Sequence, residues 1–271
     1  MEVAVETKRL LSMFRAVGLS GLIPKVKLHF NPDGVSALNP GTGKQIMSRV
    51  WFSKDFFINY DVSESTTVTL NCDQVVSLLK VVKDNKVTLT VDSNYVYIKG
   101  NSVDVRVPQV VIDEESIPVE LFEAPFGEIV VKKRDTEEET KQVAEEFLKL
   151  YCYTKIPILP GSQLDPLKVD KITFEVRDGR LFMIQENEVG VRFGRNISEM
   201  VNNAKDGVRV TVRTEFIKEA MKSFLSGEVY IAIGQKENGW PLAVILCDKT
   251  TDWRITVPIA PRVEEISEEE E

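Results

Sequence analysis

The sequence has few of the residues that most often carry enzyme chemistry. It contains a single histidine, His29, among 271 residues, so no Ser/His or Cys/His catalytic arrangement can be assembled. Its three cysteines, Cys72, Cys152 and Cys247, are scattered and form no CxxC pair. That pattern argues against a metal site and a disulfide framework, and for a reducing compartment. The sequence therefore predicts a protein that is not an enzyme and that needs no metal or cofactor.

Long hydrophobic runs are also missing. No apolar stretch approaches the roughly twenty residues that a membrane helix needs. The start of the sequence, Met1-Glu2 followed by an alternating strand, does not resemble a signal peptide. Hydrophobic residues make up 43% of the chain and charged residues 28%, which is ordinary for a soluble globular protein. We therefore expect a soluble, intracellular protein whose length is sufficient for two domains.

Positive charge is in deficit, since the formal net charge is −8 at pH 7. Most of the deficit lies in the segment 264–271, whose six glutamates leave the rest of the chain near −2. An acidic run of this kind is typical of a solvated, disordered segment. The remaining body is close to neutral and can still gather positive charge on one face.

A strand–helix–strand pattern occurs twice in the sequence. Residues 68–91 alternate, then place apolar residues at helical spacing, then alternate again, and residues 208–233 repeat the pattern. When Leu79 is aligned with Met221, Lys80 coincides with Lys222. The repetition favours two similar halves over a chance recurrence of a common motif.

Two hairpin signals recur at nearly the same spacing as the repeated helices. Asp33-Gly34 and Asp178-Gly179 each lie between alternating runs, which is a strong short-range signal for a β-hairpin. This second coincidence of order and spacing strengthens the prediction of a duplicated architecture.

Further elements follow from local patterns. The sequence predicts a helix that opens at Thr7 and another from Thr136 to Tyr151, the latter with a Thr136/Glu139 capping box. Asn71 or Asp73, and Thr214 in the second half, are the expected caps of the repeated helices. The Pro- and acid-rich stretch 110–127 predicts an exposed connector, and 155–170, with three prolines, an extra loop. Strands are expected at 102–107 and 188–193.

These patterns divide the chain into four parts. We expect a first domain at 1–109, an interdomain connector at 110–127, a second domain at 128–263 and an acidic, disordered tail at 264–271.

The order of these elements resembles that of the DNA sliding clamps of archaea and eukaryotes, the proliferating cell nuclear antigen (PCNA) family. The stretch Phe30 to Leu38 and the ending Ile255 to Arg262 look very like the corresponding parts of the family, and 68–91 fits its first repeated unit. The resemblance covers the chain from Met1 to Glu265.

The resemblance implies a fold and a function. The fold is α+β, with two similar clamp-type domains that each place antiparallel sheets outside and two helices inside, and each chain forms a third of a ring. The function is that of a processivity factor that encircles double-stranded DNA. Expected partners are DNA polymerase, clamp loader, flap nuclease and ligase, which bind through short peptide motifs, and the chain itself, as a homotrimer or a heterotrimer. The compartment would be the cytoplasm in an archaeal or viral host and the nucleus in a eukaryote.

The resemblance also implies which cations face DNA. Lys and Arg on inward helices attract phosphates without reading bases, so that a ring can slide. The candidates are Lys8, Arg9, Arg15, Lys80, Lys83, Lys141, Lys149, Arg213, Lys218 and Lys222. The third predicted helix departs from this pattern because glutamates outnumber its two lysines.

Two further surfaces come from the resemblance. A groove for client peptides is expected at Ile46, Met47, Ile117, Pro118, Pro241, Ala260 and Pro261. Contacts between subunits are expected where edge strands pair, at Val103, Val105, Val107, Val189, Val191 and Phe193.

Two alternatives to a homotrimeric clamp remain open. The chain could be one subunit of a hetero-oligomeric or checkpoint-type ring, or a two-domain β-rich binding module that does not act on DNA. The solution mass discriminates among these alternatives.

Overall fold

The computed structural model describes residues 1–112, 119–234 and 244–262 of the chain. Within these residues it contains nineteen strands, five α-helices and three short 3₁₀ turns. The 3₁₀ turns lie at Leu19–Gly21, Thr42–Lys44 and Lys54–Phe56. The sheets are antiparallel, so the predicted α+β fold with antiparallel sheets is confirmed.

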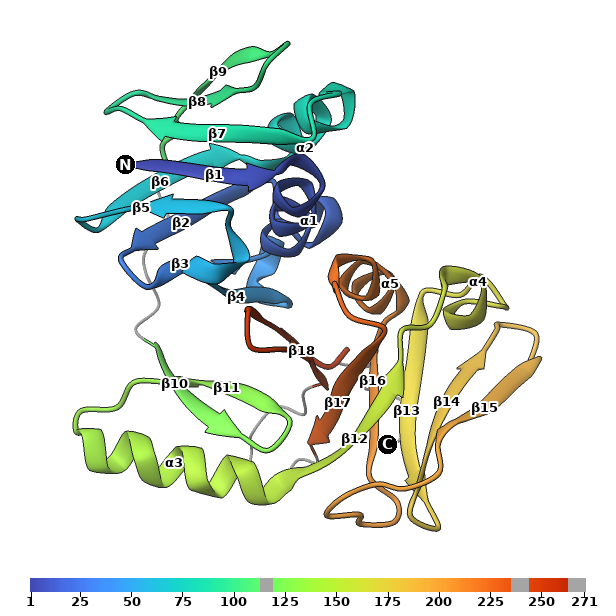
Figure 1. Ribbon diagram of the computed structural model, residues 1–271. Helices are drawn as coiled ribbons and strands as arrows, with labels where there is room; N and C mark the ends of the chain where they lie inside the picture. Colours follow the sequence, from blue (N-terminus) through green and yellow to red (C-terminus); the bar gives the residue numbers. More distant parts are fainter. Residues whose placement is uncertain (113–118, 235–243, 263–271) are drawn as a thin grey trace.

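The first half of the chain builds a five-stranded sheet in the order β5-β1-β7-β8-β9 (Figure 1). Its strands are β1 Glu2–Glu6, β5 Asn59–Asp61, β7 Lys86–Val91, β8 Tyr95–Lys99 and β9 Asp104–Pro108. The middle of β1 is buried at Val3, Ala4 and Val5, so it is covered on both faces, and only Glu2 and Glu6 at its ends are exposed. Strand β9 forms one edge of this sheet.

An eight-stranded sheet joins the two halves in the order β12-β17-β18-β19-β4-β3-β2-β6. Its strands are β2 Lys25–Asn31, β3 Gly34–Pro40, β4 Met47–Ser53, β6 Thr66–Asn71, β12 Tyr151–Pro157, β17 Glu228–Gly234, β18 Val244–Lys249 and β19 Trp253–Ile259. The halves meet where β4 pairs with β19, with Val50 opposite Ile255.

The second half adds a four-stranded sheet in the order β15-β14-β13-β16 and a separate hairpin. The sheet consists of β13 Lys171–Arg177, β14 Arg180–Glu186, β15 Arg192–Ser198 and β16 Arg209–Arg213. The hairpin consists of β10 Val119–Ala124 and β11 Gly127–Lys132.

Both predicted Asp-Gly hairpins are present, between β2 and β3 and between β13 and β14. Asp178 and Gly179 both have positive φ, which a tight hairpin turn requires and which Asp and Gly tolerate. At Gly34, a side chain is excluded because an added Cβ would lie 2.1 Å from the Phe52 carbonyl oxygen.

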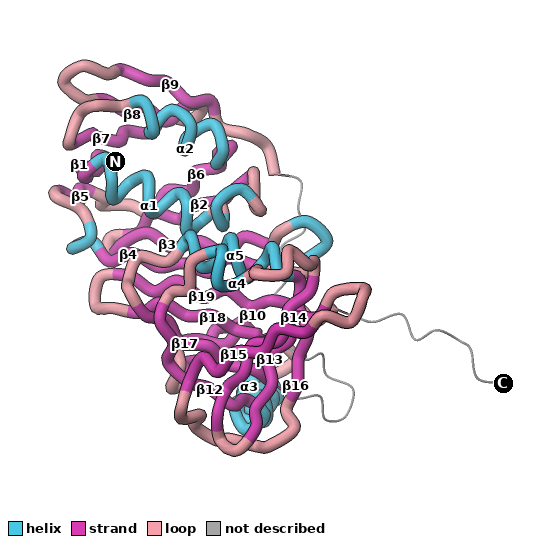
Figure 2. The backbone as a smooth tube through the Cα atoms, turned by 90° about the vertical axis from the view of Figure 1, so that its right-hand side faces the viewer, coloured by secondary structure: helices cyan, strands magenta, loops and turns pink. Residues whose placement is uncertain are grey.

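Four helices form a row along one side of the sheets, as Figures 1 and 2 both show. They are α1 Thr7–Val17, α2 Cys72–Val81, α4 Gly161–Leu164 and α5 Thr214–Ser223. Helix α1 packs against both α2 and α5, and α5 packs against α4. The row rests on one core that runs through both halves of the chain.

Two of the three predicted helix caps are confirmed. The Asn71 side chain accepts a hydrogen bond from the Gln74 amide at 3.1 Å, and Thr136 and Glu139 form the capping box. The prediction that Thr214 caps α5 is wrong: Arg213 occupies the cap position, and Thr214 is the first helical residue, 2% exposed.

Helix α3 (Glu137–Leu150) does not belong to the row. It lies on the hairpin β10–β11, away from α1, α2 and α5 in both views (Figures 1 and 2). Together they form a second, smaller core that covers the outer side of β17 and β18 at Ala232 and Ile245. We call residues 119–150, which comprise β10, β11 and α3, the outer module.

The strand that corresponds to β1 in the second half is therefore β12. β1 pairs with β7, the strand after α2, and β12 likewise pairs with β17, the strand after α5. In each half the chain then passes through a helix of the row, α1 or α4, before it enters the Asp-Gly hairpin. The expectation of an extra loop at 155–170 is thus wrong, since this stretch contains the end of β12 and helix α4.

Two other expected boundaries shift. The stretch 110–127, expected as an exposed connector, includes strand β10. Apolar residues of this stretch, Phe126 among them, are buried because they belong to the smaller core under α3. The strand expected at 188–193 begins only at Arg192, because Asn187 and Gly190 form a turn closed by the bond from the Asn187 amide to the Val191 carbonyl. Val189 and Val191 therefore lie in the turn before β15.

Candidate nucleic-acid interface and partner surfaces

The cations of the helix row differ in how freely they meet solvent. Arg15 and Lys218 are half-buried, whereas the other cations of the row are exposed, namely Lys8, Arg9, Lys80, Lys83, Arg213 and Lys222. They come from α1, from α2 and the residues after it, and from α5 and the residue before it. The sequence prediction therefore placed these eight residues on or next to helices that do lie together.

Several of these cations already contact neighbouring groups. Arg9 donates a hydrogen bond to the Phe56 carbonyl at 3.0 Å, and its guanidinium lies 5.5 Å from the centre of the Phe56 ring. On α5, Lys218 pairs with Asp165 at 3.0 Å and Lys222 with Glu219 at 2.6 Å. Their positive charge is therefore partly neutralised within the protein.

A hollow of about 600 Å³ lies where α1, α2 and α5 meet. Arg15, Lys80 and Lys222 line it, one from each helix, together with the carboxylates of Asp73 and Glu219. We call it the central hollow. Three helices thus bring cations that are far apart in sequence to one place, which a sequence pattern alone does not reveal.

Lys141 and Lys149 lie elsewhere. Both are exposed on α3, in the outer module, and the row of α1, α2, α5 and α4 does not include that helix. The predicted helix with an excess of glutamates is therefore not part of the row.

The expected client groove is described only in part. Ile117, Pro118 and Pro241 lie outside the described residues. Met47, Ala260 and Pro261 are half-buried near the junction of the two halves, where the Ala260 amide donates to the Gln45 carbonyl at 2.7 Å. Ile46 is 2% exposed and belongs to the main core, so its side chain cannot line a surface groove.

The residues expected between subunits lie near two sheet edges. Val105 and Val107 are on β9, Val103 just precedes it and Phe193 is on β15. Among the described strands, β9 pairs only with β8 and β15 only with β14, so each has one side without a partner strand.

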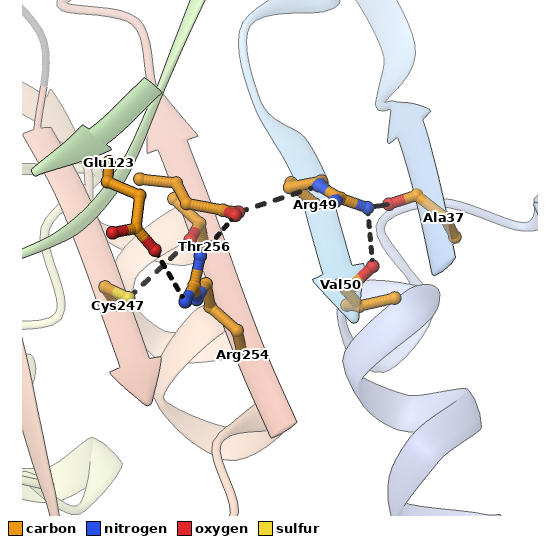
Figure 3. Close-up of polar contacts among 8 residues, drawn as sticks. Ala37, Arg49, Val50, Glu123, Cys247, Arg254 and Thr256 are labelled. Carbon is orange, nitrogen blue, oxygen red and sulfur yellow. Dashed lines mark hydrogen bonds and ion pairs between the residues drawn. The ribbon is translucent and has the colours of Figure 1, made fainter. Parts of the chain in front are cut away.

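An ion cluster, buried except at Glu123, joins the outer module to the junction of the halves (Figure 3). Glu128 of β11 pairs with Arg254 of β19 at 2.6 Å and lies 3.6 Å from Arg49 of β4. Glu123 of β10 pairs with Arg254 at 3.1 Å. We call these four residues the seam cluster.

In the seam cluster, burial disfavours the charged form of the two arginines, and the Glu128 carboxylate counteracts this effect. Burial lowers the pKa of Arg49, and the Glu128 carboxylate beside it opposes this change. For Arg254 burial also works to lower the pKa, but the hydrogen bond to Glu128 leaves that pKa raised. The sequence patterns did not predict this cluster, although Glu128 does interrupt an otherwise apolar run, Gly127 to Val131.

The groups that could carry chemistry are inert or dispersed within the described residues. No group of three or more His, Cys, Asp or Glu there could hold a metal ion, and no helix there is long and apolar enough to cross a membrane. Burial raises the pKa of Cys72 to about 12 and that of Cys247 to about 11, so both thiols stay protonated at neutral pH.

A curated relative resembles the chain over almost its whole length. It is named DNA polymerase sliding clamp 1, from Thermococcus kodakarensis, and is 25% identical over 257 residues, which cover 91% of this chain and 92% of that protein. No protein-family model matches the chain.

Solved structures of PCNA proteins have the same fold. PCNA of Entamoeba histolytica superposes with a TM-score of 0.74 at 13% identity, covering 97% of this chain and 98% of that one. In a PCNA2–PCNA3 complex from Sulfolobus tokodaii the values are 0.72 and 18%, covering 97% and 100%. PCNA of A. fulgidus, solved with the C-terminal region of FEN-1, gives 0.71 and 17%, covering 97% and 99%.

The fold is therefore that of a sliding clamp. The curated relative and the structural neighbours together confirm the resemblance found in the sequence and support a sliding clamp of the PCNA family.

Proposed function

We propose that this protein is a DNA sliding clamp, a processivity factor that surrounds duplex DNA as a ring and tethers replication and repair enzymes without catalysing a reaction. One observation carries the proposal: a row of helices with exposed cations lies on one side of the sheets, and two of the edge strands, β9 and β15, are the counterparts of β19 and β4, which pair at the internal junction. The function places the protein inside the cell, where duplex DNA is found.

The internal junction shows how copies would join. β4 is the fourth strand of its half by pairing order, and it pairs antiparallel with β19, the last strand of the other half. The corresponding strands are β15, the fourth of the second half, and β9, the last of the first half. When β9 of one copy pairs with β15 of the next, the junction repeats between chains and these two edges are covered.

Ring closure in this way involves the predicted interface residues unequally. Val107 is 2% exposed and already packs in its own core, so β9 contributes mainly its backbone there. Phe193 is half-buried on β15, and Val189 and Val191 are exposed in the turn before it. We propose that these three apolar residues are covered in the ring.

The solution mass tests ring formation. A homotrimer has three times the chain mass of 30.6 kDa by light scattering. Arg192→Glu with Phe193→Asp places charge on the β15 edge and should give monomers. Lys141→Glu with Lys149→Glu on α3 is the matched control and should leave the trimer intact. A trimer that survives the β15 change would contradict this assembly.

The DNA-facing surface we propose consists of the row cations: Lys8, Arg9, Arg15, Lys80, Lys83, Arg213, Lys218 and Lys222. Lys141 and Lys149 are left out because α3 is not in the row. Such a surface attracts phosphates of any sequence, so binding should be weak, sequence-independent and steeply dependent on salt.

Salt titration of duplex binding tests this surface. Replacing Lys8, Lys80 and Lys83 by Ala should reduce the slope of log affinity against log salt by about 0.9 for each phosphate that the protein no longer neutralises. Lys141→Ala with Lys149→Ala is the control of like charge and should leave the slope unchanged. If the α3 pair matters as much as the row, or if affinity depends on base sequence, the proposed surface is wrong.

Client enzymes would bind on the outer side, near Met47, Ala260 and Pro261. Short motifs of polymerase, loader, nuclease and ligase are the proposed ligands, and the neighbour solved with the C-terminal region of FEN-1 supports this kind of partner. Titration of such a peptide by calorimetry tests the site. Ala260→Glu should abolish binding in a protein that remains a trimer, and unchanged affinity would move the site elsewhere.

A mixed ring is the second candidate. The PCNA2–PCNA3 complex shows that proteins of this fold assemble with different partners. In this chain α4 has only four residues, so the two halves present unequal helices toward any neighbour. A chain that stays monomeric alone at high concentration would favour the mixed ring.

We also propose a revised domain division. The first clamp domain is 1–109, and the second begins at β12 rather than at residue 128, since β12 is the counterpart of β1. The outer module is then an addition between the domains.

A further inference from the structure

The helices of the row carry unequal charge in the two halves of the chain. Along the row they follow in the order α2, α1, α5 and α4, so the two helices of each half are neighbours (Figure 1). Helices α1 and α2 together contain four cations and one carboxylate, whereas α5 contains two of each and α4 contains no charged residue. The first half therefore presents a net positive surface on this side, and the second half a neutral one.

Charged residues beside the helix ends keep this difference. Within three residues of a helix end they are Glu6, Lys83 and Asp84 in the first half, and Asp165 and Arg213 in the second. When they are included, five cations face three carboxylates in the first half, and three cations face three carboxylates in the second. The contrast therefore does not depend on the exact helix bounds.

The cations of the two halves also differ in their partners. Four of the five in the first half form no ion pair within the described part of the chain, namely Lys8, Arg15, Lys80 and Lys83. The fifth, on α1, lies 3.9 Å from Glu6. In the second half, Lys218 pairs with Asp165 at 3.0 Å and Lys222 with Glu219 at 2.6 Å. A phosphate that approaches these two lysines also meets their carboxylates, so it gains less there than beside a cation of the first half.

One position of the repeat contributes directly to this contrast. Lys80 of α2 and Lys222 of α5 are counterparts in the repeat, and both are exposed. Three residues before them stand Ser77 and Glu219, and both of these line the central hollow. The same lysine therefore has a neutral hydroxyl as its neighbour in the first half and a carboxylate partner in the second.

We propose that duplex DNA contacts this protein through the first half, along α1 and α2, and that α5 and α4 form a neutral surface between successive contacts. In a ring of three copies, positive and neutral sectors then alternate around the hole, so the duplex meets three attractive sectors and not six. This inference rests on the proposed function, because it takes the helix row as the surface that faces DNA. The cations of the first half then set the salt dependence of binding.

Exchanging one residue between the halves tests the proposal. Ser77→Glu gives Lys80 the neighbour that Lys222 has, and Glu219→Ser gives Lys222 the neighbour that Lys80 has. Duplex binding is measured by fluorescence anisotropy as a function of salt. Ser77→Glu should lower the slope of log affinity against log salt by about 0.9 for each phosphate that is no longer neutralised, and Glu219→Ser should make the slope steeper.

Two variants of the outer module control for net charge. Gln142→Glu and Glu145→Ser, both at exposed positions of α3, change the net charge by the same amounts as the two exchanges. They should leave affinity and slope as in the native chain, because charges beyond a Debye length of about 10 Å are largely screened at about 0.1 M salt. Effects as large as those of Ser77→Glu and Glu219→Ser would overturn the proposal.

Removing the counterpart lysines compares the halves directly. Lys80→Ala should reduce the salt slope at least about twice as much as Lys222→Ala. Equal reductions would overturn the unequal halves and leave the clamp intact. If the native chain does not bind duplex DNA even at low salt, the proposed function itself fails.

Photocrosslinking locates the contact without changing a charge. Ser77→Cys on α2 and Ser162→Cys on α4 replace exposed residues and can be labelled with a photoreactive maleimide. The native cysteines are buried and should not react. With the protein saturated by duplex DNA at about 50 mM salt, the label at position 77 should give roughly threefold more crosslinked DNA than the label at position 162. Comparable yields, or a higher yield at position 162, would overturn the proposed placement.

Discussion

The two halves of the chain share most of their strand pairings, apart from β5 on β1, but close their inner sides differently. In the first half, the eleven-residue helix α1 lies beside α2 and buries Leu10, Met13, Phe14 and Val17. In the second half, the four-residue helix α4 lies beside α5 and buries Leu164. The sheet framework therefore defines the repeat, because the strand pairings persist where a helix is reduced to little more than one turn.

The polar contacts under the two helix pairs differ as well. Beneath α4, Asp165 accepts hydrogen bonds from Lys218 at 3.0 Å and from Gln185 at 3.2 Å. Beneath α1, the contact with α2 is apolar apart from the Cys72 thiol, which donates to the Phe14 carbonyl at 3.1 Å. The second half thus has a shorter helix and, in addition, the hydrogen bonds of Asp165 to Lys218 and Gln185, which we call the polar anchor of α4.

The largest difference between the halves should appear when a core residue of each helix is truncated. Phe14→Ala on α1 should lower the free energy of unfolding by about 3–5 kcal/mol, and Leu164→Ala on α4 by about 2–3 kcal/mol, since both are buried but the phenyl ring leaves a larger cavity. Urea denaturation measures both. If Leu164→Ala costs as much as Phe14→Ala, α4 is as important to its half as α1 is.

The outer side shows a second difference, because only the second half carries the outer module. Glu128→Gln in the seam cluster should cost about 2–4 kcal/mol, since Arg49 and Arg254 lose the carboxylate that compensates their burial. Glu123→Gln is the control: its side chain is 76% exposed, and its loss should cost less than about 1 kcal/mol.

Equal effects of the two glutamates would show that the seam cluster is solvated. Native-state hydrogen exchange adds a local measurement. Relative to the native chain, Glu128→Gln should accelerate the exchange of the β10 and β11 amides more than that of the β2 and β3 amides. The reason is that the seam cluster holds the outer module and not the hairpin of the first half.

Local signals in the sequence identified much of this framework. The Asp33-Gly34 and Asp178-Gly179 hairpins depend on residues that tolerate positive φ, and the capping box of α3 depends on Thr136 and Glu139, so neighbours in sequence suffice. The row cations on α1, α2 and α5 were instead inferred from the resemblance to the sliding clamps.

These local signals do not determine where an element lies in the three-dimensional structure. The apolar face of α3 shows that the helix packs on something, but its period does not say whether it covers the inner or the outer side of a sheet. In the same way, the alternation near Ile46 does not say which side is outward, and α4 is too short to show a helical period. The three-dimensional positions of these elements depend on pairings between strands that are distant in sequence, β12 with β17 and β4 with β19.

Acid should weaken the polar anchor of α4 and leave α1 unaffected. Burial works to raise the pKa of Asp165, but hydrogen bonds from Lys218 and Gln185 outweigh it and hold the pKa below its ordinary value. A carboxylate with a lowered folded pKa stabilises the fold above its unfolded pKa of about 3.9, and this contribution is lost as the pH falls through the folded pKa.

Asp165→Asn removes that pH dependence. At neutral pH it should cost about 1–2 kcal/mol, and the difference from the native chain should shrink below about pH 4. Thermal unfolding as a function of pH measures it. Asp178→Asn, in an exposed turn, is the control. A difference that persists unchanged into acid would mean that the Asp165 charge does not stabilise the fold.

The smallest predicted effect compares the first residues of α2 and α5. Cys72 and Thr214 are each 2% exposed at the same place in their halves. The Cys72 thiol has the Phe14 carbonyl as its acceptor, whereas the Thr214 hydroxyl has no hydrogen-bond partner within the described part of the chain. Replacing a buried, unpartnered hydroxyl by a methyl group removes its desolvation penalty without leaving a cavity. Thr214→Val should therefore stabilise the protein by up to about 1 kcal/mol in urea denaturation. Thr214→Ala, which leaves a gap, should not stabilise it, and a loss of stability in the Val variant would show that the hydroxyl is paired in solution.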